Sequence, residues 1–191
     1  MVFQLLVLRM AIESVIPEIL ERPLGSSFFL ITSFQNDDSY FELKSITEKK
    51  FSKTLFESNV LPKWELDTVE RLTSIAGHQT RILSFMRRVH REELVQIKKD
   101  CIEIQNHLRK SDSLFRLIPG YLTSHNVVIA QSKDDFHRIY LFAGVYGEIV
   151  YVYRSGKFSV LDSAPGFFKN KESLYFFSNL RESYEYNKFK D

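Results

Sequence analysis

The sequence contains a single cysteine, Cys101, so no disulfide can form within the chain. A lone cysteine also cannot anchor a thiolate zinc site, and the five histidines show no paired ligand spacing. We therefore expect no bound metal and no cofactor. The absence of disulfides fits a reducing compartment, and we expect a cytoplasmic or otherwise intracellular protein.

Glycine and proline are also scarce, at seven and five residues. Such a chain has little room for long flexible linkers, and it contains no internal repeat and no low-complexity segment. Its 191 residues are 44% hydrophobic and 26% charged, which is typical of a globular protein. We expect one domain that spans residues 1–191.

No apolar run is long enough to cross a membrane. The segment Val2–Leu8 is strongly apolar but far shorter than the roughly 20 residues that a spanning helix needs, and Arg9 ends it. No basic region precedes it and no small-residue cleavage site follows it. We interpret it as a buried strand or the first turns of a buried helix, and we expect no membrane association.

The sequence shows no catalytic signature. The carboxylate pairs Asp37-Asp38 and Asp134-Asp135 both fall in predicted turns, where aspartate is favoured by local backbone hydrogen bonding. No glycine-rich phosphate loop and no G-x-S-x-G motif occurs. We assign no catalytic residue, and the sequence favours a protein that is not an enzyme.

The clearest periodic pattern runs from Gln79 to Leu108 and predicts a long amphipathic helix. Together with a capped helical pattern that begins at Asp67, it predicts a helical middle over residues 62–110. One flank of the apolar stripe is acidic and the other is basic. The apolar stripe comprises Leu83, Met86, Val89, Leu94, Ile97, Cys101, Ile104 and Leu108. The basic flank comprises Arg81, Arg87, Arg88, Arg91, Lys98 and Lys99.

The C-terminal part changes to the pattern of short strands. Residues 126–162 predict a four-strand antiparallel meander, and Asn170 can cap a final helix over residues 171–183. The four expected strands are Asn126–Ala130, His137–Ala143, Glu148–Arg154 and Lys157–Leu161. Two proline-glycine pairs, Pro119-Gly120 and Pro165-Gly166, predict turns before and after the meander.

The N-terminal part predicts a hairpin of Phe28–Phe34 and Tyr40–Leu43, joined by the turn-forming residues 35–38. A capping box at Ser45 and Glu48 then predicts a helix. The fold expected from these elements is α+β. An antiparallel sheet, made of the C-terminal meander and the N-terminal hairpin, packs against the long amphipathic helix.

Three functional hypotheses follow, in this order. The first is an interaction or accessory protein, of viral or phage type, that binds a protein partner or itself through the basic-edged helix or the loop of Phe167 and Phe168. The second is a nucleic-acid-binding protein whose basic flank follows the phosphates. The third is a hydrolase or nuclease whose residues converge only in the fold.

Overall fold

The computed structural model describes residue 20, residues 22–61 and residues 79–187, so the expectations for Val2–Leu8 and for residues 62–78 lie outside the described residues. Within them the chain forms one eight-stranded antiparallel sheet and three α-helices, which confirms the α+β fold. The strands are β1 (Ser26–Phe34), β2 (Thr54–Glu57), β3 (Gln79–Val89), β4 (Arg116–Leu122), β5 (Asn126–Gln131), β6 (Ile139–Phe142), β7 (Val145–Arg154) and β8 (Lys157–Val160). The helices are α2 (Asp37–Lys50), α3 (Leu94–Leu108) and α4 (Lys171–Asn187), with 3-10 turns η2 (Arg91–Glu93) and η3 (Gly166–Lys169).

The strands lie in the order β2-β3-β1-β4-β5-β7-β6, and β8 pairs with β7. β1 is an interior strand of this sheet, since Leu30 pairs with Leu83 of β3 on one side and with Pro119 of β4 on the other. All nine residues of β1 are buried. The strand that the rest of the sheet is built around is therefore an uninterrupted buried run near the N-terminus.

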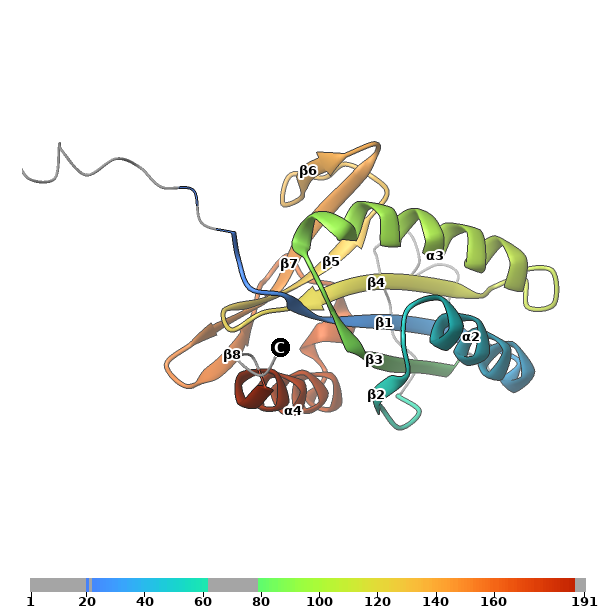
Figure 1. Cartoon of the computed structure of the whole chain (residues 1–191), viewed down its shortest axis with the longest axis horizontal. Coiled ribbons are helices and arrows are strands. Elements are labelled where there is room, and N and C mark those ends of the chain that lie inside the picture. Colours follow the sequence, from blue (N-terminus) through green and yellow to red (C-terminus); the bar gives the residue numbers. More distant parts are fainter. Residues whose placement is uncertain (1–19, 21, 62–78, 188–191) are drawn as a thin grey trace, which may run out of the picture.

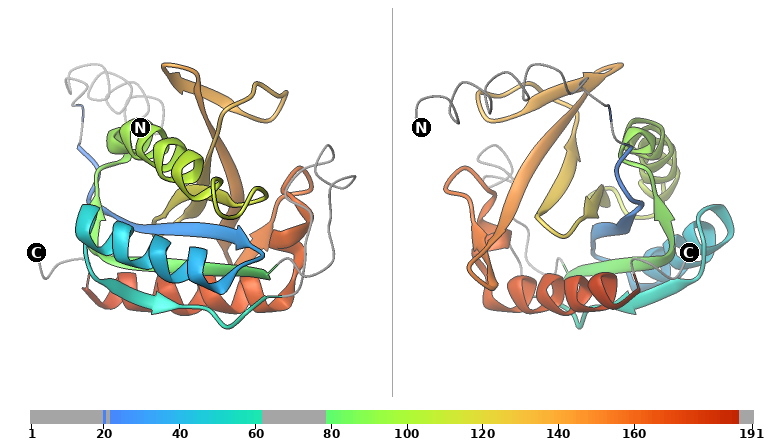
Figure 2. Two further views of the ribbon diagram at one scale, coloured as in Figure 1. Left: turned by 90° about the vertical axis from the view of Figure 1, so that its right-hand side faces the viewer. Right: turned by 60° about the vertical axis from the view of Figure 1, so that its left-hand side comes forward.

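Helices cover both faces of the sheet (Figures 1 and 2). Helices α2 and α3 pack with Phe28 and Leu30 on one face, whereas α4 and η3 pack with Phe29 and Ile31 on the other. This division follows from the alternation of side chains along a strand. β1 thus contributes large apolar side chains to two separate cores.

The expected turn at Pro119-Gly120 is wrong, because both residues lie inside β4. A Cβ atom at Gly120 would lie 2.4 Å from the Phe29 ring and 2.4 Å from the Val128 carbonyl oxygen. Glycine is needed here because a ring and a neighbouring backbone approach the strand closely, and not because the chain turns.

The expected N-terminal hairpin is also wrong in its second strand. The Asn36 side chain accepts a hydrogen bond of 2.9 Å from the Asp38 backbone N–H and caps α2, so the residues expected to form a turn begin a helix instead. Tyr40 and Leu43 lie on the buried side of that helix. The helix start expected at Ser45 falls inside α2.

The expected long helix over 79–108 is correct only in its second half. Gln79–Val89 forms strand β3, which pairs with β1 and β2, and the chain turns at His90, whose backbone N–H donates to Glu93 Oε1 at 2.7 Å. α3 then buries the C-terminal part of the predicted stripe, Leu94, Ile97, Cys101, Ile104 and Leu108. Because both faces of β3 are covered, its apolar residues do not alternate strictly, and helical spacing arises by coincidence.

The four C-terminal strands occur where they were expected, but their order differs from a meander. β5 pairs with β7 and not with β6, and β6 and β8 pair with the two ends of β7. The connection 132–138 therefore crosses the start of β7. The final helix is confirmed as α4, and the Asn170 side chain accepts a hydrogen bond from the Glu172 N–H at 2.9 Å.

None of the helices in the described ranges has both the length and the apolar character needed to cross a membrane.

Candidate functional site

Five exposed apolar side chains are gathered on and beside strand β6. We call the five of them the β6 surface; their exposed fractions are Phe136 93%, Ile139 64%, Tyr140 57%, Leu141 41% and Phe142 66%. In both views the β6 end of the sheet projects from the body of the molecule (Figures 1 and 2). Single exposed apolar residues are common, but five within seven residues form a patch typical of interaction sites.

β6 is the last strand of the sheet, so its outer edge has no strand partner among the described residues. Its inner edge pairs Ile139 with Gly147 and Tyr140 with Tyr146. The strand contains no lysine and no proline, the residues that most often protect such an edge from pairing with another chain. The β6 surface therefore combines apolar side chains with free backbone hydrogen-bonding groups.

A tight turn joins β6 to β7. Ala143 and Gly144 both have positive φ angles, of 49° and 79°. Two consecutive residues with positive φ are the mark of the two-residue hairpin turn whose twist matches the strands. The turn holds β6 against β7 with a short connection.

A buried carboxylate lies beneath the connection that leads into β6. Glu148 has no exposed surface, and its Oε2 accepts hydrogen bonds of 3.0 Å from both Arg138 Nε and Gln131 Nε2. The His137 ring lies beside it, with Nε2 3.1 Å from Glu148 Oε1 and Nδ1 3.7 Å from Asp135 Oδ1. Neither ring nitrogen has the geometry of a hydrogen bond in this arrangement, so the His137 ring packs against the two carboxylates without bonding to them.

This buried cluster fastens the crossing connection to β7. Arg138 also donates to the Lys133 carbonyl oxygen at 3.2 Å, so one guanidinium bridges the start of the connection and the strand beneath it. Titratable groups do converge here, as the hydrolase hypothesis requires. However, the Glu148 carboxylate is sealed from solvent, which favours an anchoring role over contact with a substrate.

A second polar cluster joins α2, β2 and β3 around Glu57. Its carboxylate accepts hydrogen bonds from Tyr40 Oη at 2.5 Å, Lys44 Nζ at 2.7 Å and Arg81 Nη1 at 2.8 Å. Burial raises the pKa of Glu57, but these hydrogen bonds and the two positive charges outweigh it and leave the pKa below its usual value. Burial and the same carboxylate raise the pKa of Tyr40.

The predicted basic flank does not form one surface. Arg81 and Arg87 lie on β3 and pair with Glu57 and Glu93, and Arg88 lies on the opposite face of that strand, over the Tyr184 ring at 5.3 Å. Arg91 is exposed in η2, while α3 buries Lys98 and exposes Lys99. The six basic residues are Arg81, Arg87, Arg88, Arg91, Lys98 and Lys99. The nucleic-acid hypothesis expects a single cationic helix face, and that expectation is therefore wrong.

The expected exposure of Phe167 and Phe168 is wrong as well. Their exposed fractions are 0% and 1%, because η3 folds under the sheet and Phe168 packs against Tyr151 and Phe177. The Tyr151 hydroxyl donates to the Phe168 carbonyl oxygen. The two rings belong to the core under α4.

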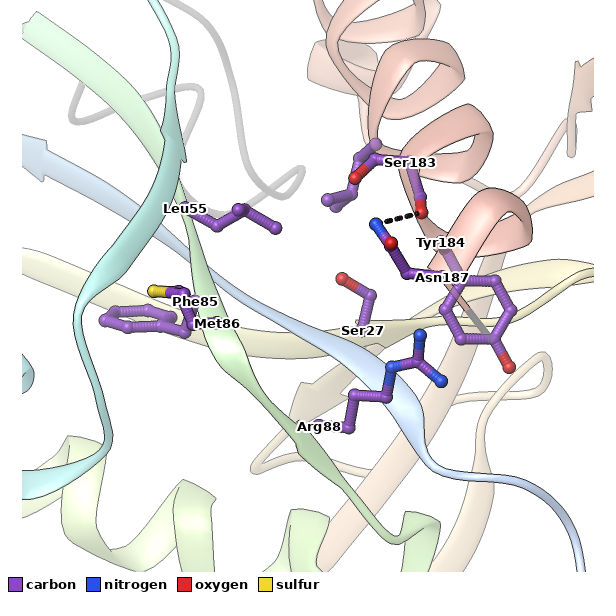
Figure 3. Close-up of a pocket in the computed structure, with 9 residues that line it drawn as sticks. Ser27, Leu55, Phe85, Met86, Arg88, Ser183, Tyr184 and Asn187 are labelled. Carbon is purple, nitrogen blue, oxygen red and sulfur yellow. Dashed lines mark hydrogen bonds between the residues drawn. The ribbon is translucent and has the colours of Figure 1, made fainter. Parts of the chain in front are cut away.

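Arg88 also lines a cavity of about 280 Å³ between β3 and the last turns of α4 (Figure 3). Ser27, from the neighbouring strand β1, lies beside it, and Asn187 lines the cavity from the helix. In the same ranges, 22–61 and 79–187 with residue 20, no group of three or more histidine, cysteine, aspartate or glutamate side chains is arranged to hold a metal ion.

The sequence reasoning missed the residues that position β6. The sequence pattern places Glu148 and His137 only at the starts of two expected strands. A signal was present, since Glu148 is an acidic residue within a strand that is apolar on both faces up to its last residue, Arg154. A charge inside such a strand is stable only if a partner is buried with it.

Comparison of the sequence with known protein families gives one match. Residues 25–184 match the family described as a domain of unknown function, DUF4416, so the chain belongs to that family. No curated protein and no solved structure gives a significant match.

Proposed function

We propose that this member of the DUF4416 family is a self-associating interaction protein, and that the β6 surface of one copy pairs with the β6 surface of a second copy. The observation that carries the proposal is the exposure of five large apolar side chains, four on an unprotected edge strand and Phe136 beside it. An open edge allows another strand to continue the sheet through backbone hydrogen bonds, with side chains adding affinity.

The partner favoured by these features is a second copy. β6 itself carries no charged residue, so two copies can approach without like charges facing each other along the strand. Antiparallel pairing of two identical strands creates a closed two-fold interface, which ends the assembly at a dimer. The charged residues Asp134, Asp135 and Arg138 all precede the strand, and Arg138 is already paired with the buried Glu148.

The apolar area is sufficient for such a dimer. An aromatic side chain buries about 150–250 Å² on complete burial, so the three exposed rings of the β6 surface leave roughly 300–500 Å² per copy. At about 25 cal/mol per Å², two copies would gain on the order of 15–25 kcal/mol before association costs estimated at about 4–15 kcal/mol. We expect a dissociation constant in the micromolar range.

The pairing register limits which residues meet. Opposite residues in an antiparallel pair lie on the same face, so a two-fold axis must pass between one residue and its own copy. In the four-residue strand β6, the central candidates are Tyr140 and Leu141. Directly opposite Cα atoms lie about 4.5–5.5 Å apart, which is within the range that a disulfide spans.

A cysteine variant tests the proposal directly, because the native Cys101 is fully buried and does not interfere. Tyr140→Cys and Leu141→Cys are oxidised separately, and one of them is expected to form a disulfide-linked dimer at micromolar protein. Phe41→Cys serves as the matched control, since Phe41 on α2 is 65% exposed and lies far from β6 in the sheet order. Equal cross-linking of all three variants, or none, would contradict pairing through β6.

Light scattering coupled to size-exclusion chromatography supplies the second test. The wild type is expected to dimerise across the micromolar range, and Phe142→Ser to weaken the dimer at least tenfold. Phe41→Ser, at a side chain of nearly equal exposure (65% against 66%), should leave the dimer unchanged. A wild type that stays monomeric at all concentrations would overturn the proposal.

A further inference from the structure

A second open edge lies at the other end of the sheet, where strand β2 and helix α4 lie beside each other (Figure 2). A cavity of about 750 Å³ separates the chain after β2 from the first half of α4, within the roughly 300–1,000 Å³ of most binding sites. We call it the β2–α4 groove. Residues 56–61 line one side of it, and the other side is lined by Lys171, Glu172, Tyr175, Phe176 and Asn179.

The lining residues show that the groove follows an edge of the chain and not a face of the sheet. All six residues from Phe56 to Leu61 border it. Successive side chains of an extended segment point to opposite faces, so a cavity over one face would be lined by alternate residues. The lining residues of α4 recur at intervals of four and so form one face of the helix. The groove therefore runs between the edge of an extended segment and one helix face.

The backbone of this segment has unused hydrogen-bonding groups. The N–H groups of Ser58 and Leu61 donate to carbonyl oxygens of β3, at 2.9 Å and 2.8 Å. Between these two residues, the N–H groups of Asn59 and Val60 make no hydrogen bond to any described residue, and both residues are exposed. A row of unpaired N–H groups on an edge can pair with a further strand.

The side chains beside these groups are mostly apolar. The exposed fractions are 40% for Phe56, 45% for Val60 and 71% for Tyr175. Phe176, from the next position of the helix, is buried among the core residues below. An apolar side chain that enters the groove thus meets aromatic rings from both walls.

The charges of the groove cancel. Lys171 and Glu172 are neighbours at the start of α4, carry opposite charges, and their side chains make no ion pair with a described residue. The third charged side chain, Glu57, accepts hydrogen bonds from Lys44 Nζ at 2.7 Å and Arg81 Nη1 at 2.8 Å, so its charge is compensated within the fold. The described part of the groove therefore has no net charge, and a neutral partner complements it best.

We propose that the β2–α4 groove binds an uncharged, extended peptide segment of a partner protein, which adds to the sheet as a further strand. Backbone groups of residues 59 and 60 pair with the peptide backbone, and alternate peptide side chains lie against Phe56 and Tyr175. At about 3.3 Å per residue, residues 56–61 span roughly 17 Å, which accommodates about five peptide residues. The site lies at the opposite end of the sheet order from β6 and does not depend on the proposed dimer.

The probe is a pentapeptide of alternating threonine and valine with blocked ends, titrated into the full chain and followed by amide chemical shifts. We expect binding in the high micromolar to millimolar range, with the largest shifts at Asn59 and Val60. Two N-methylated forms of the peptide are the matched comparisons, one methylated at the odd residues and one at the even residues. Alternate N–H groups of a strand lie on opposite edges, so one form should bind at least tenfold more weakly and the other like the unmodified peptide.

Three outcomes of these titrations would refute the proposal. The first is no binding of the unmodified peptide up to about 10 mM. The second is equal binding of both N-methylated forms, which shows that no strand pairing takes place. The third is at least tenfold tighter binding of a form with lysine or glutamate in place of threonine, which shows that the groove selects a charged partner.

Variants of the two walls locate the peptide. Val60→Pro removes an N–H group that bonds to no described residue, and it should weaken binding at least tenfold, whereas Val60→Thr keeps the N–H group and should bind like the wild type. Tyr175→Ala tests the helix wall and should weaken binding at least threefold. Tyr186→Ala is its matched control, since Tyr186 is 76% exposed on the same helix and does not line the groove.

The same variants separate this site from other occupants. Binding that survives both Val60→Pro and Tyr175→Ala would place the peptide elsewhere, for example on β6, and overturn the assignment. If Val60→Pro instead weakens self-association of the full chain and the peptide does not bind, the occupant is a second copy and the proposal of a separate partner is wrong. Circular dichroism checks that each variant is folded, and the N-methylated peptides and Tyr175→Ala decide the question if Val60→Pro is not.

Discussion

Replacement of Glu148 by glutamine should destabilise this protein more than any other neutralisation of a described carboxylate. The substitution keeps the volume of the side chain but removes the charge opposite Arg138, whose side chain is only 6% exposed. The guanidinium would then remain buried without its counter-charge, and water cannot replace the lost partner. His137 Nε2 lies 3.1 Å from the same carboxylate.

The cost follows from the burial of the pair. Breaking a buried ion pair by removing one partner typically costs about 3–5 kcal/mol. For a chain of this size each kcal/mol lowers the melting temperature by about 2–4 °C, so we expect a decrease of roughly 6–20 °C. Glu57→Gln is the matched control, because Glu57 also accepts three charged or hydroxyl donors but its side chain is 25% exposed. Solvent weakens the interactions of the Glu57 carboxylate, so we expect Glu57→Gln to lower the free energy of unfolding by about 1 kcal/mol or less.

Denaturant unfolding followed by circular dichroism measures both variants. Amide hydrogen exchange should also accelerate in residues 132–138 of Glu148→Gln, because the crossing connection is fastened by this carboxylate. The double variant Glu148→Leu with Arg138→Met removes both charges and should recover at least half of the lost stability. A Glu148→Gln variant within about 1 kcal/mol of the wild type, or one no worse than Glu57→Gln, would refute the reasoning.

Four further predictions concern other parts of the fold. Gly120→Ala should cost about 1–3 kcal/mol in urea unfolding, since its Cβ would lie 2.4 Å from a backbone oxygen, whereas Gly147→Ala, with its nearest neighbour at 3.5 Å, should be nearly neutral. The thiol of Cys101, whose pKa is raised by burial, should react with Ellman's reagent only in the unfolded protein. Ala143→Gly should stabilise the protein by about 0.5–1 kcal/mol because Ala143 has a φ of 49°. Folding lowers the pKa of Glu57 below 4.5, so the unfolded state takes up this proton at a higher pH than the folded state does. The contribution of Glu57 to stability is therefore present above pH 4.5 and is lost as the pH falls through the lower, folded-state pKa. Glu57→Gln should make the free energy of unfolding less dependent on pH in that acidic range.

The strands of the C-terminal half were predictable from sequence because their turn residues are explicit. The Ser155-Gly156 turn has positive φ at both positions, as its sequence suggests, and the strands on either side follow. Their order was not predictable, since a local pattern cannot show that the connection 132–138 crosses β7. The pairing of β7 with both β5 and β6 shows this crossing.

The prediction of a helix over residues 79–89 was wrong for a different physical reason. Leu83, Met86 and Val89 are spaced as on a helix, but β3 is covered on both faces and so loses the alternation that marks a strand. The structure buries Leu83 and Val89 and leaves Met86 62% exposed. The β6 surface was missed because apolar residues in a strand are expected to be buried, and exposure is a property of sheet position that short-range sequence patterns do not carry.

The interior position of β1 has a consequence for synthesis of the chain. β1 is made early, but its neighbours β3 and β4 end at Val89 and Leu122, far later in the chain. At about 5–20 residues per second, roughly 4–18 s pass between completion of β1 and completion of β4. Until β3 is complete the nine apolar and hydroxyl residues of β1 have neither neighbouring strand, and until β4 is complete they have only one, so we expect this segment to be the point of the nascent chain most sensitive to aggregation.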